Sequence, residues 1–303
     1  MLAFLAAAIS LAGMREVMGP LPRTDHSAPK VEVLEEVRLE KYTRRKITYL
    51  AEAGDAVPAY ILIPHRRSKG APAVLCLHQT VKIGKEEPVG MGGKPNLRYA
   101  HELAERGYIT LAPDYPNFGE YNIDVYAKGY VSATMKGIFN HIRAVDLLVS
   151  MPEVDARNIG VIGHSLGGHN ALFVAAFDPR IKAVVTSCGF TSFAKYYNGN
   201  LTGWSHKGYM PRIADVYGKD PKRMPFDFSD VLNAISPRAI FINAPVRDAN
   251  FDVSGVRDCV AAVENGKRVT VVYPDAEHDF PAAERFQAYQ FFDRQLTPRH
   301  RMP

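Results

Sequence analysis

Residues 159–168 have the sequence Ile-Gly-Val-Ile-Gly-His-Ser-Leu-Gly-Gly, in which an apolar, β-branched run passes directly into a Gly-x-Ser-x-Gly motif centred on Ser165. A helix-like pattern follows over residues 169–177. In this context the serine is predicted to lie on a sharp, strained turn between strand and helix, with its hydroxyl raised at the edge of a sheet. A Cβ at Gly163 or Gly167 would clash across such a turn. A chance motif in a loop is the alternative, and the flanking strand and helix patterns argue against it.

Length and composition are those of an ordinary soluble globular protein. The chain has 303 residues, of which 47% are hydrophobic and 23% are charged, and α/β folds of about 250 residues commonly form one domain. The net charge of +5 comes from Lys and Arg residues scattered along the chain, as expected of a general protein surface. This distribution argues against a nucleic-acid-binding role.

Three cysteines lie far apart among apolar neighbours, at Cys76, Cys188 and Cys259. No Cys-x-x-Cys pair occurs, and an odd number of cysteines leaves at least one thiol free. We therefore expect buried, small hydrophobic side chains, with neither a disulfide framework nor a metal site.

The N-terminal residues 2–12 are almost wholly apolar, with small residues at Ser10 and Ala12. This run suits the hydrophobic part and cleavage site of a signal peptide and is too short to span a bilayer. No Lys or Arg precedes it, so an ordinary buried N-terminal segment is the alternative. We favour export, which would make the protein periplasmic or secreted; without a signal peptide it would be cytoplasmic. Residues 18–29, which contain three prolines, are predicted to be a linker.

Residues 30–303 are predicted to form a single α/β domain, preceded by the signal peptide and linker at 1–29. Alternating polar and apolar residues predict three antiparallel strands near its start, at 31–38, 46–51 and 59–63. Short continuous apolar runs then predict strands that are buried on both faces, at 73–77, 109–112, 159–162, 183–186, 239–243 and 269–272. Helix-periodic stretches separate these runs, at 96–106, 132–149, 253–265 and 282–295. This alternation predicts a mostly parallel central sheet of about eight strands, flanked by helices.

Residues 189–237 interrupt the alternation with a long segment rich in aromatic and polar residues, including the single tryptophan, Trp204. A connection of that length is unusual in a compact domain unless it serves a site. We expect short helices that form a partial lid over Ser165. A packing excursion on the flank of the sheet is the alternative.

A serine hydroxyl needs a histidine to accept its proton and a carboxylate to orient that histidine. In folds with this motif the chain order is serine, acid, histidine, so the base must follow Ser165. His278 comes directly after the last apolar run, in a loop from which its side chain can reach the serine. The other downstream histidines lie on the helix after the motif, in the insertion and near the C-terminus: His169, His206 and His300. His278 is therefore the predicted general base.

The predicted acid is Asp248, the first carboxylate after the apolar run 239–243. From the loop after this strand it can turn toward His278 and hold the imidazole in one tautomer, without itself taking the proton. Asp252 is the alternative, although its position suits the N-cap of the helix that begins at Val253.

Two backbone donors are expected to bind the oxyanion of the tetrahedral intermediate. One is the N–H of Leu166, next to the nucleophile, and the other comes from the loop after the strand at 73–77. Gln79 is the predicted second donor, with Thr80 as the alternative. His78 is expected to support this loop structurally.

Five short motifs give the chain a resemblance to the α/β-hydrolase superfamily, in particular to its dienelactone-hydrolase and acetyl-xylan-esterase-like branch. They are Leu77-His78-Gln79-Thr80, Gly84-Lys85, Ala112-Pro113-Asp114-Tyr115, Gly-His-Ser-Leu-Gly-Gly at 163–168 and His-Asp-Phe-Pro at 278–281. The resemblance covers about residues 44–296 and implies a serine esterase or lactonase; some members resemble prolyl oligopeptidases. Two features depart from the pattern. Dienelactone hydrolases have cysteine where this chain has Ser165, and the oxyanion loop lacks the His-Gly-Gly-Gly of many lipases.

The residues and this resemblance together predict a carboxylic ester hydrolase that works through the serine–histidine–aspartate triad and an acyl-enzyme intermediate. Expected substrates are small-molecule or carbohydrate esters, including aryl esters, whose groups would contact Tyr115, Tyr121 and Trp204. No cofactor, metal, nucleic acid or stable membrane insertion is expected, and the oligomeric state stays open.

Two other functions use the same fold. A serine peptidase of prolyl-oligopeptidase type would have the same triad, but such peptidases usually carry a large extra domain, for which 303 residues leave no room. A non-catalytic binding protein would have no reason to keep all three triad residues in the correct order.

Overall fold

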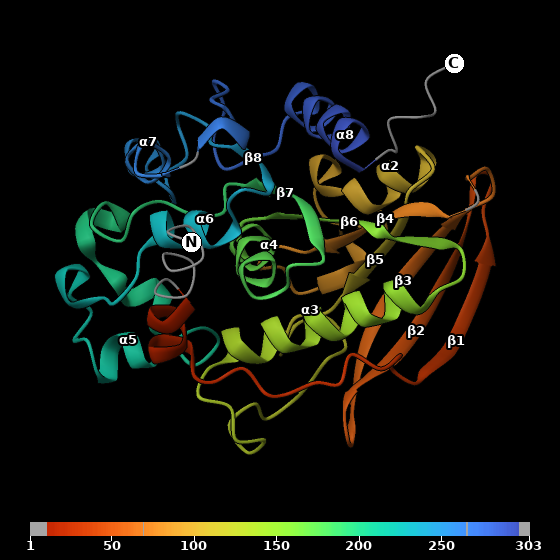
Figure 1. Cartoon of the computed structure of the whole chain (residues 1–303), viewed down its shortest axis with the longest axis horizontal. Helices are drawn as coiled ribbons and strands as arrows, with labels where there is room; N and C mark the ends of the chain where they lie inside the picture. Colours follow the sequence, from red (N-terminus) through yellow and green to blue (C-terminus); the bar gives the residue numbers. More distant parts are fainter. Residues whose placement is uncertain (1–10, 69, 265, 297–303) are drawn as a thin grey trace.

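The computed structural model describes residues 11–68, 70–264 and 266–296, which form a layered α/β structure (Figure 1). Within these residues nine strands make one sheet, in the order β1-β2-β3-β5-β4-β6-β7-β8-β9. Helices cover both faces of the sheet (Figure 1). The predicted α/β-hydrolase architecture is confirmed, with one strand more than the eight or so expected.

The first three strands form an antiparallel meander at one end of the sheet, as predicted. They are β1 (Val31–Arg38), β2 (Tyr42–Glu52) and β3 (Asp55–Pro64). β3 also pairs antiparallel with β5 and so joins the meander to the rest of the sheet. β1 is an edge strand and is exposed along nearly its whole length. Its glutamates, among them Glu35 and Glu36, discourage pairing of this edge with another chain.

The remaining six strands are parallel and form the centre of the sheet, as the continuous apolar runs predicted. They are β4 (Ala71–Leu77), β5 (Ile109–Pro113), β6 (Val154–His164), β7 (Ile181–Ser187), β8 (Ala239–Asn243) and β9 (Val269–Val272). Successive residues of β4 enter different hydrophobic cores, Leu75 one core and Val74 the other. Burial of both faces explains why these strands lack a polar alternation.

Two hydrophobic cores form, one on each face of the sheet. The larger core is covered by α3 (Ala133–Ser150), α4 (Leu166–Phe177), α6 (Phe228–Ile235) and α7 (Val253–Ala261). The smaller core is covered by α2 (Tyr99–Glu105) and α8 (Ala282–Leu296). The long helix α3 begins after Ser132, whose side-chain oxygen accepts a hydrogen bond from the Met135 N–H at 3.0 Å and so caps the helix.

The insertion 189–237 contains short helices, as predicted. They are the 3-10 turns η3 (Tyr196–Gly199), η4 (Leu201–Trp204) and η5 (Pro221–Arg223), together with α5 (Arg212–Asp215) and α6. Further 3-10 turns lie elsewhere, at η1 (Gly84–Glu86), η2 (Pro95–Leu97) and η6 (Gly266–Arg268). Trp204 packs among aromatic rings at centroid distances of 5.5–6.1 Å: Phe193, Tyr196, Tyr209, Phe228 and Phe251. These rings belong to the larger core, so the cluster joins the insertion to the rest of the domain.

The N-terminal residues 11–18 form a helix that packs into the larger core, with Met14, Val17 and Met18 fully buried. Its Glu16 carbonyl accepts a hydrogen bond from Arg212 of the insertion at 2.7 Å. Residues 1–10 of the predicted signal peptide lie outside the described residues, so the signal peptide stays a prediction. None of the helices within the described residues is both long and apolar enough to cross a membrane.

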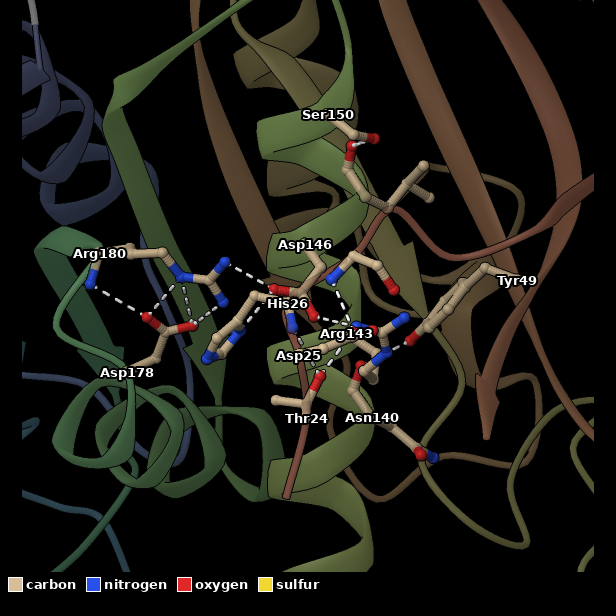
Figure 2. Close-up of polar contacts among 12 residues, drawn as sticks. Thr24, Asp25, His26, Tyr49, Asn140, Arg143, Asp146, Ser150, Asp178 and Arg180 are labelled. Carbon is tan, nitrogen blue, oxygen red and sulfur yellow. Dashed lines mark hydrogen bonds and ion pairs between the residues drawn. The ribbon is translucent and has the colours of Figure 1, made fainter. Parts of the chain in front are cut away.

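The segment that follows, predicted as a linker, lies along α3 (Figure 2). His26 Nδ1 contacts a carboxylate oxygen of the buried Asp146 at 2.9 Å, and Thr24 Oγ1 accepts a hydrogen bond from Arg143 at 3.0 Å. Asp146 also pairs with Arg143 and, at 2.6 Å, with Arg180. This charge network holds the N-terminal segment against the domain.

Candidate active site

Ser165 lies between β6 and α4 in a backbone conformation that few residues other than glycine adopt. Its φ is 52° and its ψ is −116°, so the turn is strained, as the motif predicted. The Ser165 N–H donates to the Ser187 carbonyl at 2.9 Å, which ties the turn to the end of β7. The sheet therefore holds this serine at its carboxyl edge.

Gly163 and Gly167 let β6 and α4 approach each other closely. A Cβ on Gly163 would overlap the carbonyl oxygen of Gly167, and a Cβ on Gly167 would overlap the carbonyl oxygen of Leu77. Both obstacles are backbone atoms, which cannot move aside as a flexible side chain can. The predicted clash at both glycines is confirmed.

His278 and Asp248 form a close pair at the carboxyl edge of the sheet. His278 Nδ1 lies 3.0 Å from one carboxylate oxygen of Asp248 and 2.9 Å from the other. The Asp248 carboxylate also accepts hydrogen bonds from the N–H groups of Asn250 at 2.8 Å and Phe251 at 3.1 Å. These bonds fix the carboxylate, which is nearly fully buried, so that it can orient the imidazole.

Asp252, the alternative acid, has a different partner. Its side chain accepts a hydrogen bond from the Ser254 N–H at 2.7 Å and caps α7. Of the two aspartates, Asp248 is therefore the one that contacts His278.

Ser165 and His278 line one cavity of about 270 Å³ at the carboxyl edge of the sheet. The other lining residues come from the loop after β4, from α4, from the insertion and from the loop after β8: Gln79, Thr80, His169, Tyr196, Gly203, Trp204, Tyr209, Asn250 and Phe251. Between these two described side chains no hydrogen bond is formed. Catalytic hydrogen bonds are often long without substrate and shorten in the Michaelis complex. A shared cavity is therefore compatible with a nucleophile and its base.

The loop after β4 brings Gln79 to the cavity. His78 Nδ1 contacts the Gln79 carbonyl oxygen at 2.6 Å, and His78 Nε2 accepts a hydrogen bond from the Tyr115 N–H at 2.9 Å. Burial lowers the pKa of His78, which keeps the ring neutral, with one donor and one acceptor nitrogen. His78 thus supports the loop, as expected. Leu166 is the first residue of α4, where an N–H has no acceptor within the helix.

A buried ion pair holds the segment that follows the β4 loop. Lys85 Nζ lies 2.7 Å from a carboxylate oxygen of Asp114, and both side chains are fully buried. The Lys85 N–H donates to the other oxygen of Asp114 at 2.8 Å. A Cβ on Gly84 would overlap this carboxylate. The Gly84-Lys85 motif therefore fixes the segment that follows the β4 loop to the end of β5.

The three predicted substrate-binding side chains occupy different places. Trp204 lines the cavity that Ser165 and His278 share. Tyr121 lines a neighbouring groove, and its buried hydroxyl donates to Asp55 at 2.8 Å. Tyr115 is buried, and its hydroxyl donates to the Gly208 carbonyl at 3.1 Å. The structure thus brings Trp204 to Ser165, while it places Tyr115 under the insertion.

Several cavity residues were missed by sequence reasoning. His169 was predicted only to lie on the helix after Ser165, but its ring lines the cavity and lies 4.7 Å from the ring of Trp204, centroid to centroid. Burial lowers the pKa of His169 to about 3, so it is neutral near pH 7. Asn250 and Phe251 reach the cavity from the loop that carries Asp248. Their closeness to Asp248 in sequence was the available signal.

His164 and Cys188 lie behind His278. The His164 ring meets that of His278 edge-on, with centroids 4.8 Å apart, and burial lowers the pKa of His164 far below its ordinary value. Among the described residues, His164, Cys188 and His278 form one group whose metal-type donor atoms lie within 4.8 Å of one another. In this group His278 also contacts the Asp248 carboxylate through Nδ1.

The model of the prolyl oligopeptidase family matches residues 96–297, which is two thirds of the chain and includes Ser165, Asp248 and His278. The chain belongs to the prolyl oligopeptidase family. A second model, described as an abhydrolase family, matches residues 7–133.

This member of the prolyl oligopeptidase family is similar to several hydrolases. YtaP of Bacillus subtilis, a protein named as a hydrolase, is 26% identical over 301 residues, covering 92% of this chain and 96% of YtaP. A glucuronoyl esterase from Solibacter usitatus superposes with a TM-score of 0.75 at 16% identity, over 96% of this chain and 92% of that one. Acetyl xylan esterase 1 from Thermoanaerobacterium sp. JW/SL YS485 gives 0.64 at 18% identity, over 93% and 97% of the two chains. The resemblance to α/β hydrolases is confirmed, and at these identities the two solved structures establish the fold alone.

Proposed function

We propose that this α/β hydrolase is a serine esterase with Ser165 as nucleophile, His278 as general base and Asp248 as the residue that orients the base. One observation supports this proposal above all others. The strained serine lines the same cavity as an imidazole whose Nδ1 contacts a buried carboxylate. That combination supplies a nucleophile, a proton acceptor and a fixed tautomer.

The reaction proceeds in two halves. Ser165 Oγ attacks the ester carbonyl carbon while its proton passes to His278 Nε2, and the Asp248 carboxylate stabilises the imidazolium. The N–H groups of Leu166 and Gln79 are the proposed donors to the oxyanion. When the intermediate collapses, the carbon–oxygen bond to the alcohol breaks and His278 gives its proton to the departing oxygen. Water, deprotonated by the same imidazole, then attacks the acyl-enzyme. As the bond between the acyl carbon and Ser165 Oγ breaks, His278 returns its proton to Oγ, and the acid leaves.

The small volume of the cavity favours esters that place only a compact group inside it. Its volume of about 270 Å³ is below the range of roughly 300–1,000 Å³ usual for small-molecule sites. Aromatic side chains such as Trp204 and Tyr209 line it together with polar groups, a combination that suits an aryl or a sugar-like group. Glucuronoyl and acetyl xylan esterases among the structural neighbours agree with carbohydrate esters as one substrate class.

A fluorophosphonate probe and a panel of esters test this proposal. The wild-type protein should be labelled by the probe and should hydrolyse p-nitrophenyl acetate, an acetylated sugar or a feruloyl ester. Ser165→Ala should abolish both labelling and hydrolysis. Ser205→Ala is the matched control, because Ser205 lies in the insertion but does not line the cavity. Hydrolysis that survives in Ser165→Ala, or a wild type that the probe never labels, would remove the proposal and favour a non-catalytic binding protein.

A peptidase is the second candidate, and the family match favours it. The same triad can cleave amides, so geometry alone does not separate the two activities. A p-nitrophenyl ester and the p-nitroanilide of the same acyl group separate them by the ratio of their kcat/KM values. We expect hydrolysis of the ester with little or none of the anilide.

We also propose that the chain is exported and that residues 30–303 fold as one domain. Sequencing the N-terminus of the protein recovered from periplasm or medium tests export, with cleavage expected near Ala12. A chain that stays in the cytoplasm with its first residues intact would contradict this proposal.

A further inference from the structure

A second cavity adjoins the catalytic one. This outer groove, of about 520 Å³, is lined by Thr80, Val81, Lys82, Asn117, Phe118, Gly119, Tyr121 and Asn122. Thr80 lines both the groove and the catalytic cavity. The two spaces are therefore neighbours across a single residue of the oxyanion loop.

Tyr209 of the insertion lies on the catalytic side of this boundary. Its hydroxyl is 3.1 Å from Thr80 Oγ1, so the insertion and the oxyanion loop meet there. The Tyr209 ring packs against His169 and Trp204, with centroids 5.7 and 6.1 Å away. Burial raises the pKa of Tyr209, so its hydroxyl stays neutral and able to bond Thr80 at any ordinary assay pH.

The backbone around Tyr209 is held by other contacts. The Tyr209 carbonyl accepts a hydrogen bond from the Thr134 N–H at 3.3 Å. The Tyr115 hydroxyl donates to the Gly208 carbonyl at 3.1 Å, and the Tyr126 hydroxyl donates to the Lys207 carbonyl at 2.6 Å. The position of the segment therefore does not depend on the Tyr209 side chain, which can be shortened without releasing the segment.

The two sides of the catalytic cavity have different roles. The leaving alcohol must lie beside His278, because that imidazole protonates it. An open cleft beside His278, lined by residues such as Lys94, Asn96 and Arg247, can receive the alcohol. The acyl group then extends away from His278, toward His169, Trp204 and Tyr209.

We infer that Tyr209, held by Thr80, closes the acyl side of the cavity and sets the length of the acyl group that this enzyme accepts. This inference rests on the proposed esterase function. With the Tyr209 side chain in place, the cavity suits the esters of short acids. Without it, the cavity and the outer groove form one channel from Ser165 past Val81 and Phe118, which can hold a long acyl chain.

The test compares p-nitrophenyl acetate, butyrate and octanoate, which differ only in the acyl chain. The readout is the ratio of kcat/KM for octanoate to kcat/KM for acetate. Tyr209→Ala should raise this ratio about tenfold or more, since each methylene moved from water to an apolar surface favours binding. Tyr209→Phe, which loses only the hydroxyl, should raise it by a smaller factor.

Tyr126→Phe is the matched control. It removes a hydroxyl that bonds the same segment but that does not line the catalytic cavity, so the ratio should stay at the wild-type value. A ratio that rises equally in Tyr126→Phe would show general loosening and overturn the inference.

A Tyr209→Ala enzyme that still hydrolyses acetate with an unchanged ratio would also overturn it. If Tyr209→Ala does not fold, the ratio measured in Tyr209→Phe is the test. An unchanged ratio in that variant would contradict closure of the acyl side by Tyr209. Failure of the proposed function has a different signature, because the wild type would then hydrolyse none of the three esters.

Discussion

His278 Nδ1 lies within 3.0 Å of both carboxylate oxygens of Asp248, and the backbone of the loop after β8 holds that carboxylate in place. Asp248→Asn should therefore leave the fold intact but lower kcat on the order of 10⁴-fold, because an amide can stabilise the wrong imidazole tautomer. Steady-state kinetics with p-nitrophenyl acetate measure the loss. Asp252→Asn is the control: it changes only the α7 cap, so kcat should be unchanged. Equal losses in both variants would contradict the assignment of the acid.

Gly167 lies where the start of α4 meets the end of β4. Gly167→Ala should lower the free energy of unfolding by about 3 kcal/mol or more, because the new Cβ overlaps the Leu77 carbonyl oxygen, a backbone atom. Urea denaturation measures the change. Gly266→Ala is the control, since a Cβ there meets nothing within 4 Å, and we expect little effect. A stable, active Gly167→Ala protein would mean that strand and helix can separate at no cost.

The ion pair of Lys85 with Asp114 is fully buried. Lys85→Met leaves the Asp114 carboxylate without its buried counter-charge, and should reduce the free energy of unfolding by about 3–5 kcal/mol. Adding Asp114→Asn should cost less than the sum of the two single changes. Arg157→Gln, which breaks a pair whose arginine side chain is 85% exposed, should leave the free energy of unfolding nearly unchanged, because water screens such a pair. Strictly additive losses in urea denaturation would argue that Lys85 and Asp114 act independently.

Buried histidines predict a loss of stability in acid. Burial, the largest cause, lowers the pKa values of His141 and His169 from 6.5 to about 3. Between these values the unfolded chain binds protons that the folded one does not, so stability is complete above about pH 6.5 and falls as the pH drops. From pH 7 to pH 5 each histidine should cost about 2 kcal/mol.

Comparison of the wild type with His141→Leu isolates this effect. Urea denaturation at pH 7 and pH 5 should show that the acid loss is about 2 kcal/mol smaller in the variant. Asp227 works in the opposite direction, because burial raises its pKa to about 6, but it is present in both proteins and cancels. An identical pH dependence in the two proteins would contradict the prediction.

The sheet and the strained turn at Ser165 could both be predicted from the amino-acid sequence, because each depends on local chemistry. Continuous apolar runs identified strands buried on both faces, and the glycines around Ser165 identified a turn with no room for a Cβ. The N-terminal helix at residues 11–18 was harder to predict. Only its packing against the insertion and the core shows that its apolar face is buried.

Strand type, turn chemistry and the order of candidate groups along the chain follow from the amino-acid order, since they are set by steric rules within a few neighbouring residues. Tertiary packing decided which side chains share the cavity with Ser165. It turned His169 and Tyr209 inward, and it buried Tyr115 beneath the insertion. Such contacts join residues far apart in the chain. The path of the insertion that creates them depends on how its aromatic side chains pack into the larger core, which no hydrophobic period encodes.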